Sequence, residues 1–345
     1  MKSLMLQQEI TGPYTIRYKM IPVPKVGNGQ VLIRVKRIGI CGSDIHVYHG
    51  KHPYVRYPVP QGHEVSGEVA VVGEGVSNLY PGAQVTIEPQ DYCGRCYPCT
   101  HGKYNLCEDL KVMGFQTTGA GSEFFLTEAS KVVVLPEGIS LDEGAMIEPL
   151  AVTVHACKRS GDIAGKSAVI LGAGPIGILL CQTLKAFGAT RVMMTDISDY
   201  RLQISKQCGA DHVCNTQTVD FGTAVTEYFG PNKADIIYDC AGNDVTMGQA
   251  IQNARKGSVI MLIAVYAGMA NVDLAKLNDS ELDLKTSMMY RHEDYLDAIR
   301  IVDEGLVNLA PLISKHFSFA DYQKAYEFID QNRERTMKVL IDMDS

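Results

Sequence analysis

The chain has 345 residues, of which 46% are hydrophobic and 21% are charged, and its formal net charge at pH 7 is −7. This length exceeds what one ordinary hydrophobic core accommodates, so we expect two domains. The acidic balance lacks the electrostatic footprint of a nucleic-acid-binding protein, and we expect no nucleic-acid partner. The N-terminal segment 1–9 lacks the apolar stretch of a signal peptide. The uncharged segment 167–184 is as long as a short membrane span, but it contains three glycines and a proline, which favour a buried strand followed by a buried helix. We therefore predict no membrane partner and a cytoplasmic location.

The first part of the chain, up to about residue 150, is rich in short β-like segments that Gly and Pro interrupt. Turn sequences such as 27–29 and 81–82 separate these segments. This pattern predicts a mostly β domain with few helices. The strands that we expect are 31–35, 65–72, 83–87 and 131–135.

From about residue 165 the pattern changes to alternating strands and helices. This alternation predicts a parallel sheet with helices on both faces, and therefore an α/β fold. The expected strands are 168–171, 191–195, 234–240 and 258–264, and the expected helices are 176–187, 200–208 and 246–254. Further along the chain we expect helices near 295–304 and 319–331 and a strand at 338–341.

A glycine-rich segment with the pattern G-x-G-x-x-G follows the first of these strands and opens a helix. The first glycine allows a tight turn, the second lets the backbone approach a pyrophosphate, and the third allows the helix to pack closely on the strand. The segment therefore predicts a dinucleotide site. Its candidate cofactor-binding residues are Gly172, Gly174, Pro175, Ile176 and Gly177.

A carboxylate follows at the end of the second strand of this region. Asp196 lies 19 residues after Gly177, at about the spacing that places an acidic side chain on the adenosine ribose. A carboxylate accepts hydrogen bonds from the ribose hydroxyls and repels a 2′-phosphate, so we expect NAD rather than NADP. Arg201 is a further candidate for a cofactor contact. The alternative for Asp196 is a loop residue that caps the next helix.

Four of the ten cysteines lie within one short segment. Zn²⁺ prefers four tetrahedral ligands, and four thiolates complete its shell, so this segment predicts a structural zinc site with no open position. Disulfides are the alternative, although they are uncommon in a cytosolic chain, and a nucleic-acid zinc ribbon usually has two separated C-x2-C pairs. The four candidate ligands are Cys93, Cys96, Cys99 and Cys107.

Two further segments, 39–46 and 61–64, contain other side chains that bind metals. Cys41 and His63 each lie beside a glycine in a turn-like context. Taken alone, these two residues indicate little, because a single cysteine is commonly a small core residue and a single histidine is commonly satisfied within the protein.

The order of these motifs resembles that of the zinc-containing medium-chain dehydrogenases over essentially the whole chain. The motifs are Cys-Gly-Ser-Asp-x-His at 41–46, Gly-His-Glu at 62–64, the four-cysteine segment and the glycine segment. The stretch around Glu148 is most similar to sorbitol (L-iditol) dehydrogenases and their polyol and sugar-acid relatives, because classical alcohol dehydrogenases have a cysteine there. The resemblance implies a GroES-like catalytic domain formed by 1–152 and 290–345. It also implies a doubly wound Rossmann coenzyme domain at 153–289.

The resemblance also implies a second zinc ion, which is catalytic, and a role for each residue near it. Cys41 and His63 would bind zinc directly, and Glu64 would be a ligand or a neighbouring carboxylate. Glu148 would be the third ligand or would hold a zinc-bound water. The implied proton relay and catalytic residues are Ser43, His46 and Glu64.

The implied activity is NAD-linked oxidation of a secondary alcohol of a polyol or sugar derivative by a homotetramer or homodimer. An L-threonine or aldonate dehydrogenase of the same superfamily is the first alternative. A zinc-free NADPH reductase and a non-catalytic zinc-binding protein are the others. Tyr290 and Arg291 follow two methionines where sorbitol dehydrogenases have Phe-Arg-Tyr, so the arginine is displaced. The basic segment 49–57 is either a solvated loop or a receptor for a substrate anion. The substrate pocket is expected to involve Val47, Phe115, Gln116 and Glu148 as well.

Overall fold

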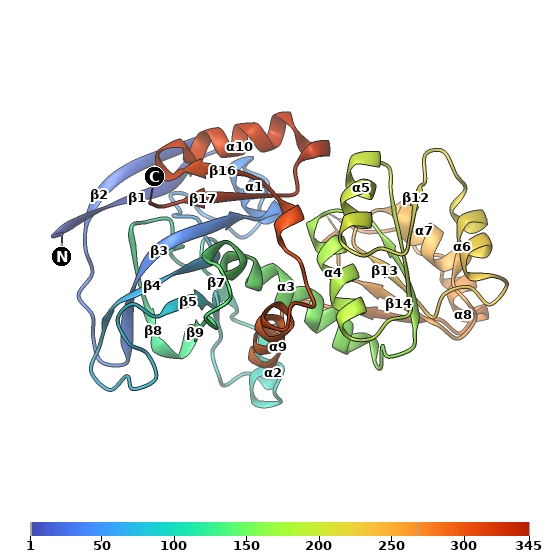
Figure 1. The fold of residues 1–345 in the computed structure, drawn as a ribbon, viewed down its shortest axis with the longest axis horizontal. Coiled ribbons are helices and arrows are strands. Elements are labelled where there is room, and N and C mark those ends of the chain that lie inside the picture. Colours follow the sequence, from blue (N-terminus) through green and yellow to red (C-terminus); the bar gives the residue numbers. More distant parts are fainter. Residues whose placement is uncertain (1, 267, 345) are drawn as a thin grey trace. The chain divides into compact units, whose positions relative to one another are not determined.

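The computed structural model describes residues 2–266 and 268–344 (Figure 1). The chain forms two compact units. The first consists of Met1–Glu148 and Ile313–Ser345, and the second of Pro149–Leu312. Among the described residues, no helix combines the length and the apolar character that crossing a membrane requires.

A seven-stranded sheet organises the first unit, with the order β16-β17-β3-β4-β5-β9 and with β8 paired to β3. β17 lies antiparallel to β3, which ends at one metal-binding motif, and β4, which begins at the other, lies antiparallel to β3 on its opposite side. The strands are β3 (Gln30–Ile40), β4 (Glu64–Val72), β5 (Gln84–Ile87), β8 (Phe124–Glu128), β9 (Val132–Val134), β16 (Ile313–Ser318) and β17 (Lys338–Asp342).

The mostly β character predicted for this unit is confirmed, and the helix α10 packs against the core beside the sheet. A hairpin of β1 and β2 and a short β6–β7 ladder complete the strands in the described part of the unit. The bounds of these elements are β1 (Leu4–Gly12), β2 (Thr15–Pro22), β6 (Gln90–Asp91), β7 (Lys111–Val112), α1 (Gly42–Tyr48), α2 (Tyr97–Thr100) and α10 (Tyr322–Gln331).

The 20-residue helix α3 (Leu141–Ser160) is the main element of this region that the sequence analysis missed. Pro149 lies inside it, where proline normally interrupts a helix, and the segment around the proline is buried on nearly all sides. Its sequence therefore has neither the amphipathic stripe nor the uninterrupted run by which helices are usually identified. Its charges agree with the helix dipole, with Asp142 and Glu143 in the first turn and Lys158 and Arg159 in the last.

The second unit contains a six-stranded, fully parallel sheet of order β12-β11-β10-β13-β14-β15, which confirms the predicted α/β fold. The chain winds outward from β10 to β12 and then from β13 to β15, so the winding reverses between β10 and β13. The strands are β10 (Ser167–Leu171), β11 (Arg191–Asp196), β12 (His212–Asn215), β13 (Ile236–Asp239), β14 (Val259–Leu262) and β15 (Asp283–Thr286).

Helices cover both faces of this sheet. Val169 and Leu171 pack in one core with the side chains of α6 and α7, whereas Ile170 points to the opposite face, toward the start of α4. This alternation along β10 is what a strand buried on both faces requires. The helices are α4 (Pro175–Ala186), α5 (Asp199–Gln207), α6 (Phe221–Phe229), α7 (Asp244–Asn253), α8 (Leu274–Asp279) and α9 (His292–Asp303).

The segment 290–312, which was expected to belong with the first domain, is part of the second compact unit. The buried Asp294 of α9 accepts a hydrogen bond from His155 of α3 at 2.7 Å. It also forms an ion pair with Lys158 of α3, at 2.8 Å. Those interactions attach α9 to the C-terminal half of α3. His155 and Asp294 are 139 residues apart, so the apolar periodicity of the sequence does not predict this contact.

Candidate metal centres and coenzyme site

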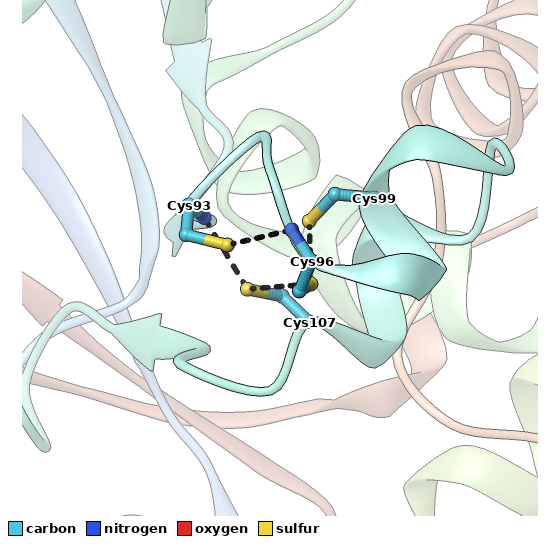
Figure 2. A group of neighbouring side chains, drawn as sticks. All are labelled: Cys93, Cys96, Cys99 and Cys107. Atoms are coloured by element: carbon cyan, nitrogen blue, oxygen red, sulfur yellow. Dashed lines mark hydrogen bonds between the residues drawn. The ribbon is translucent and has the colours of Figure 1, made fainter.

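The four-cysteine loop brings its thiols together as the sequence analysis predicted. The sulfur atoms of Cys93, Cys96, Cys99 and Cys107 lie within 4.8 Å of one another and point toward a common centre (Figure 2). The Cys96 sulfur is 3.3 Å from that of Cys99 and 3.9 Å from that of Cys107. Four sulfurs around one zinc at about 2.3 Å would be about 3.8 Å apart, so the donor set fits a tetrahedral metal. All ten cysteines are described, and none forms a disulfide.

Backbone N–H groups point at the sulfurs in this loop. Cys93 N–H donates to the Cys107 sulfur at 3.2 Å, and Cys96 N–H donates to the Cys93 sulfur at 3.4 Å. The N–H groups of Arg95 and Cys96 lower the pKa of Cys93 to about 6, whereas burial and the neighbouring thiol of Cys96 raise the pKa of Cys99 to about 12. The neighbouring thiols thus lower the pKa of Cys93 but raise that of Cys99, and a bound cation would favour the ionised form of all four.

A second group of metal-binding side chains converges in the same unit. Cys41 follows β3 and precedes α1, while His63 immediately precedes β4 and Glu64 begins it. A ligand atom from each of these three residues lies within 4.8 Å of the others. His63 and Glu64 are buried, and Cys41 is partly exposed. Adjacent antiparallel strands therefore bring together a cysteine and a histidine that are 22 residues apart in sequence.

Asp44, which sequence reasoning left without a role, orients both ends of this group. Its carboxylate accepts the Cys41 N–H at 2.9 Å, and its other oxygen is 3.3 Å from Nδ1 of His63. Burial lowers the pKa of His63, but the Asp44 carboxylate and the Cys41 thiol outweigh burial and hold the net pKa well above 6.5. A carboxylate behind a metal-binding histidine fixes the orientation and the tautomer of its ring.

Lys338 was not identified from the sequence either. Its Nζ lies 2.6 and 2.7 Å from the two oxygens of Glu64 and 3.3 Å from the Ile40 carbonyl oxygen. Both side chains are almost completely buried. Burial lowers the pKa of Lys338, but the charges of Glu64 and Cys41 more than offset this effect, and the net pKa is raised. The signal for Lys338 in the sequence was a lysine at the start of an apolar strand.

The other predicted catalytic residues lie nearby in the same unit. Ser43 and His46 are on α1, where Ser43 is partly buried and His46 is exposed. Glu148 is buried on α3, and its charge acts on Lys338, but it is not among the three residues whose ligand atoms converge. Glu148 thus remains a candidate ligand whose direct binding to a metal is a prediction.

The expected pocket residues are distributed differently from the prediction. Val47 is fully buried in the core of the first unit, and its contribution to a substrate pocket stays a prediction. Phe115 does border the metal-binding group, with its ring centroid 5.0 Å from that of His63. On its other side Phe115 stacks on His52, at 4.9 Å. The amide oxygen of Gln116 accepts the Val112 N–H at 3.0 Å.

The two residues expected in the substrate pocket from the end of the chain belong to the second unit. Tyr290 is fully buried, and Arg291 precedes α9, where its guanidinium lies 3.1 Å from a carboxylate oxygen of Glu293. Met289 has a φ of 53°, in the left-handed region that is uncommon for side chains other than glycine. The departure from Phe-Arg-Tyr thus falls on a backbone position of unusual conformation.

The glycine segment of the second unit has the geometry of a dinucleotide loop. Gly172 has a φ of 99° and turns the chain at the end of β10, and Gly174 and Pro175 begin α4. A Cβ atom on Gly177 would overlap the carbonyl oxygen of Gly172 and lie 3.1 Å from its carbon, so only glycine allows α4 to approach β10 this closely. Ile176 is partly exposed beside this turn. The N-terminus of α4 is thus left open to an anionic group.

Asp196 connects the end of β11 to this loop. Its carboxylate accepts hydrogen bonds from the N–H groups of Ala173 at 2.7 Å, Ile197 at 2.8 Å and Ser198 at 2.9 Å. Arg201, on α5, lies on the same side, because its Nη1 is the nearest atom, at 3.9 Å, to a Cβ built on Gly174. The predicted cofactor residues of this unit therefore gather at the carboxyl ends of β10 and β11.

A third group, Asp142, His316 and Asp342, also has ligand atoms within 4.8 Å of one another. Here the Arg37 Nε lies 2.7 Å from Asp142 and 3.1 Å from Asp342. His316 Nδ1 is 2.9 Å from Asp342. The guanidinium already supplies the positive charge that these carboxylates need, so this group is an ion-pair network and not a third candidate metal centre.

Comparison with known proteins agrees with this architecture. Residues 27–137 match the alcohol dehydrogenase GroES-like domain, and residues 175–304 match the zinc-binding dehydrogenase family. The chain is 34% identical to a sorbitol dehydrogenase of Halalkalibacterium halodurans, over 99% of each chain. It is 33% identical to an L-idonate 5-dehydrogenase of Vitis vinifera, over 92% of this chain and 89% of that protein.

Among solved structures, an alcohol dehydrogenase from Escherichia coli CFT073 complexed with NADH superposes with a TM-score of 0.92 at 29% identity, covering 99% of this chain and 100% of the other. The family matches, the near-complete coverage of curated relatives and the two-unit architecture point to one conclusion, which confirms the predicted resemblance. The chain belongs to the zinc-binding dehydrogenases of the medium-chain alcohol dehydrogenase superfamily, close to the sorbitol dehydrogenases.

Proposed function

We propose that this protein oxidises a secondary alcohol of a polyol or related sugar derivative to a ketone, with NAD⁺ as the hydride acceptor and with two zinc ions per chain. One observation carries the proposal most directly. Cys41 follows β3, the adjacent residues His63 and Glu64 lie at the start of β4, and their ligand atoms lie within 4.8 Å of one another. A protein that had kept the fold without the chemistry would have no need for this convergence of a thiol, an imidazole and a carboxylate.

The donor set suits a catalytic zinc. Cys41, His63 and Glu148 would hold the ion, and their two negative charges would balance its charge. Zinc supplies a Lewis acid that lowers the pKa of an alcohol hydroxyl bound to it. Ser43 would accept the hydroxyl proton as its own proton is passed on toward His46, whose exposed imidazole would release a proton to solvent. Asp44 holds the His63 ring in place during this transfer.

The second unit would bind the coenzyme. The N–H groups at the start of α4 and the absence of a side chain at Gly174 leave space for a pyrophosphate. Asp196 is fixed by three backbone N–H groups, and it would accept the ribose hydroxyls while repelling the 2′-phosphate of NADP. The Arg201 Nη1 lies 3.9 Å from a Cβ built on Gly174, so its guanidinium would contact the coenzyme phosphates. The Cys93–Cys107 loop would hold the second zinc, which is structural.

The substrate class follows from the family position and from Glu148. The curated relatives include a sorbitol dehydrogenase and an L-idonate 5-dehydrogenase, so a polyol is the main candidate, and a sugar acid is the alternative. The deciding experiment measures NADH formation at fixed pH over sorbitol, xylitol, inositols, aldonates and L-threonine, together with zinc content. We expect activity on at least one polyol and two zinc ions per chain. Activity on L-threonine with none on polyols, or fewer than two zinc ions, would contradict the proposal.

One variant separates the two zinc sites. Cys41→Ser should remove one zinc and abolish NADH formation, with the other zinc retained. Loss of both ions from this variant would contradict the assignment of separate sites.

We also propose that the protein is a homodimer or homotetramer. In support, Val265 and Met269 are almost completely exposed apolar side chains, and β15 lies at the edge of the second sheet. Light scattering that gave the mass of a single chain would exclude this assembly.

A further inference from the structure

A buried carboxylate at the end of β13 holds the turn that leads from this strand into α7. Asp239 is the last residue of β13 and is 0% exposed. Its Oδ1 accepts hydrogen bonds from the N–H groups of Ala241 and Gly242, both at 3.0 Å, and from the Thr246 hydroxyl at 3.1 Å. One oxygen of this carboxylate is therefore occupied by the turn and by the first residues of α7.

The other oxygen binds a side chain from a different loop. Tyr266 lies in the loop after β14, and its hydroxyl donates to Oδ2 of Asp239 at 2.9 Å and lies 3.0 Å from the Asn243 carbonyl oxygen. Among the described residues, no second donor reaches Oδ2. Burial and the Asp239 carboxylate raise the pKa of Tyr266, so the hydroxyl keeps the proton that this bond requires. The tyrosine thus ties the loop after β14 to the turn after β13.

The Tyr266 ring packs closely on the same turn. It adjoins the core that side chains of β10, β13, α6 and α7 form. A Cβ atom on Gly242 would lie 2.7 Å from the Ala264 Cβ and 3.7 Å from two atoms of the Tyr266 ring. Gly242 also has a φ of 72°, which favours glycine. The absence of a side chain at Gly242 therefore lets the loop after β14 lie directly on the turn.

A second contact attaches the far end of this loop to α7. The backbone N–H and the side-chain amide of Asn271 donate to the Asp244 carboxylate at 3.1 and 2.7 Å. Asp244 is the first residue of α7. The loop is thus held at Tyr266 and at Asn271, and both attachments lie at the N-terminal end of one helix.

The two connected segments border the point where the winding of the sheet reverses. In such sheets a dinucleotide binds across the carboxyl ends of the strands at the reversal, which here falls between β10 and β13. A Cβ atom on Gly172 would lie 3.1 Å from the Ala241 nitrogen, so the turn after β13 lies against the glycine turn. With the adenosine ribose at Asp196, on the β11 side, the nicotinamide half would extend past the ends of β13 and β14.

We propose that Tyr266 is a positioning residue for the nicotinamide half of the coenzyme, because its hydrogen bond to Asp239 fixes the loop after β14 before the coenzyme binds. This inference rests on the dinucleotide site proposed above. A loop that is already ordered adds no ordering cost to binding, whereas a loop that is displaced for part of the time weakens binding in proportion. A hydrogen bond to a charged group changes an equilibrium constant by about 10–100-fold, so its loss is large enough to displace the loop.

The test compares two ligands on the zinc-loaded, full-length enzyme by titration calorimetry. NADH contains both halves of the coenzyme, whereas ADP contains the adenosine ribose and the diphosphate but not the nicotinamide half. Tyr266→Phe keeps the ring and removes the hydroxyl. In this variant the Kd for NADH should rise about tenfold, and the Kd for ADP should stay at the wild-type value. An unchanged Kd for NADH, or equal weakening of both ligands, would overturn the proposal.

Thr246→Val is the matched control, because it removes a hydroxyl from the same carboxylate without touching the loop. Its Oδ1 partner on Asp239 keeps the N–H groups of Ala241 and Gly242. Both variants lose one hydrogen bond to a buried carboxylate, so both should lower Tm. Only Tyr266→Phe should change the ratio of the two Kd values. A similar change of that ratio in Thr246→Val would assign the effect to general loosening around Asp239 and would refute the role of Tyr266.

Hydrogen exchange in the free protein gives a readout that needs no coenzyme. The N–H of Ala264 donates to the Asp239 carbonyl oxygen at 3.1 Å, and that of Asn271 donates to Asp244. In Tyr266→Phe both amides should exchange about tenfold faster, while the Ile178 amide, bonded to Gly174 in α4, should not change. Wild-type exchange rates at Ala264 and Asn271 in this variant would contradict the proposal.

The wild-type protein alone decides the matter if Tyr266→Phe does not fold. NADH should then slow the exchange of the loop amides more than ADP does, and equal protection by the two ligands would show that the loop does not serve the nicotinamide half. Failure of the underlying coenzyme site looks different, because in that case the wild-type protein would bind neither NADH nor ADP.

Discussion

Replacing Gly177 by alanine tests how the second unit builds its coenzyme site. The added Cβ would overlap the carbonyl oxygen of Gly172 and lie 3.1 Å from the attached carbon. The obstacle is backbone at the end of β10, so it cannot rotate away as a side chain would, and α4 must move outward. Overpacking a tight site costs about 1–3 kcal/mol, and a backbone obstacle places this variant near the upper value. For a unit of this size, about 3 kcal/mol corresponds to a fall of about 6–12 °C in Tm.

Gly174→Ala is the matched control in the same loop. A Cβ atom on Gly174 meets only the Arg201 guanidinium, at 3.9 Å, so the folded protein can accommodate it. This variant should keep its Tm within a few degrees but bind NADH more weakly, because the methyl group takes the space of the pyrophosphate. Calorimetry and fluorescence titration with NADH measure the two effects. If Gly177→Ala kept both the wild-type Tm and the wild-type Kd for NADH, the argument that only glycine at this position allows α4 to pack closely on β10 would be wrong.

Three further predictions follow from other residues. In Asp294→Asn the loss of stability should be at most roughly 2 kcal/mol, because the hydrogen bond from His155 and the pair with Lys158 outweigh burial and lower the pKa of Asp294 from 3.8 to about 2. That contribution is present above pH 4 and is lost as the pH falls toward 2, so urea titrations of variant and wild type should converge there; a difference that persists at pH 2 would contradict this cause. Cys107→Ser should release one zinc and lower Tm while the second zinc remains, which metal analysis after gel filtration would show; retention of both ions would refute the four-thiol site. Asp196→Ser should raise the KM for NAD⁺ and increase the relative use of NADP⁺ in initial-rate assays, whereas an unchanged preference would remove Asp196 from coenzyme selection.

The parts of the fold that the sequence predicted well have a strong local signal. The strands and helices of the second unit alternate with clear apolar periodicity, and the glycine segment falls where β10 meets α4. The four thiols of the zinc loop are close in sequence, so their spacing alone brought them together. The helix α3 was missed because Pro149 and the buried residues around it hide its period.

The metal-binding group near Cys41 could not be predicted from local sequence patterns alone. Cys41 and His63 became meaningful only through the resemblance, because the pairing of β3 with β4 that unites them is not visible in either segment. Lys338 is 274 residues from Glu64, and no local pattern connects them. Its one signal is a charged residue in an apolar strand, which requires a buried counter-charge that the sequence cannot locate.

The connection of the strands also bears on the order in which the protein matures. The second unit is a single continuous segment, Pro149–Leu312, whereas the first is completed only when β16 and β17 have been added. During synthesis, Cys41, His63 and Glu64 are therefore made long before Lys338. Until that strand pairs with β3, the Glu64 carboxylate lacks the ammonium group that pairs with it in the folded protein.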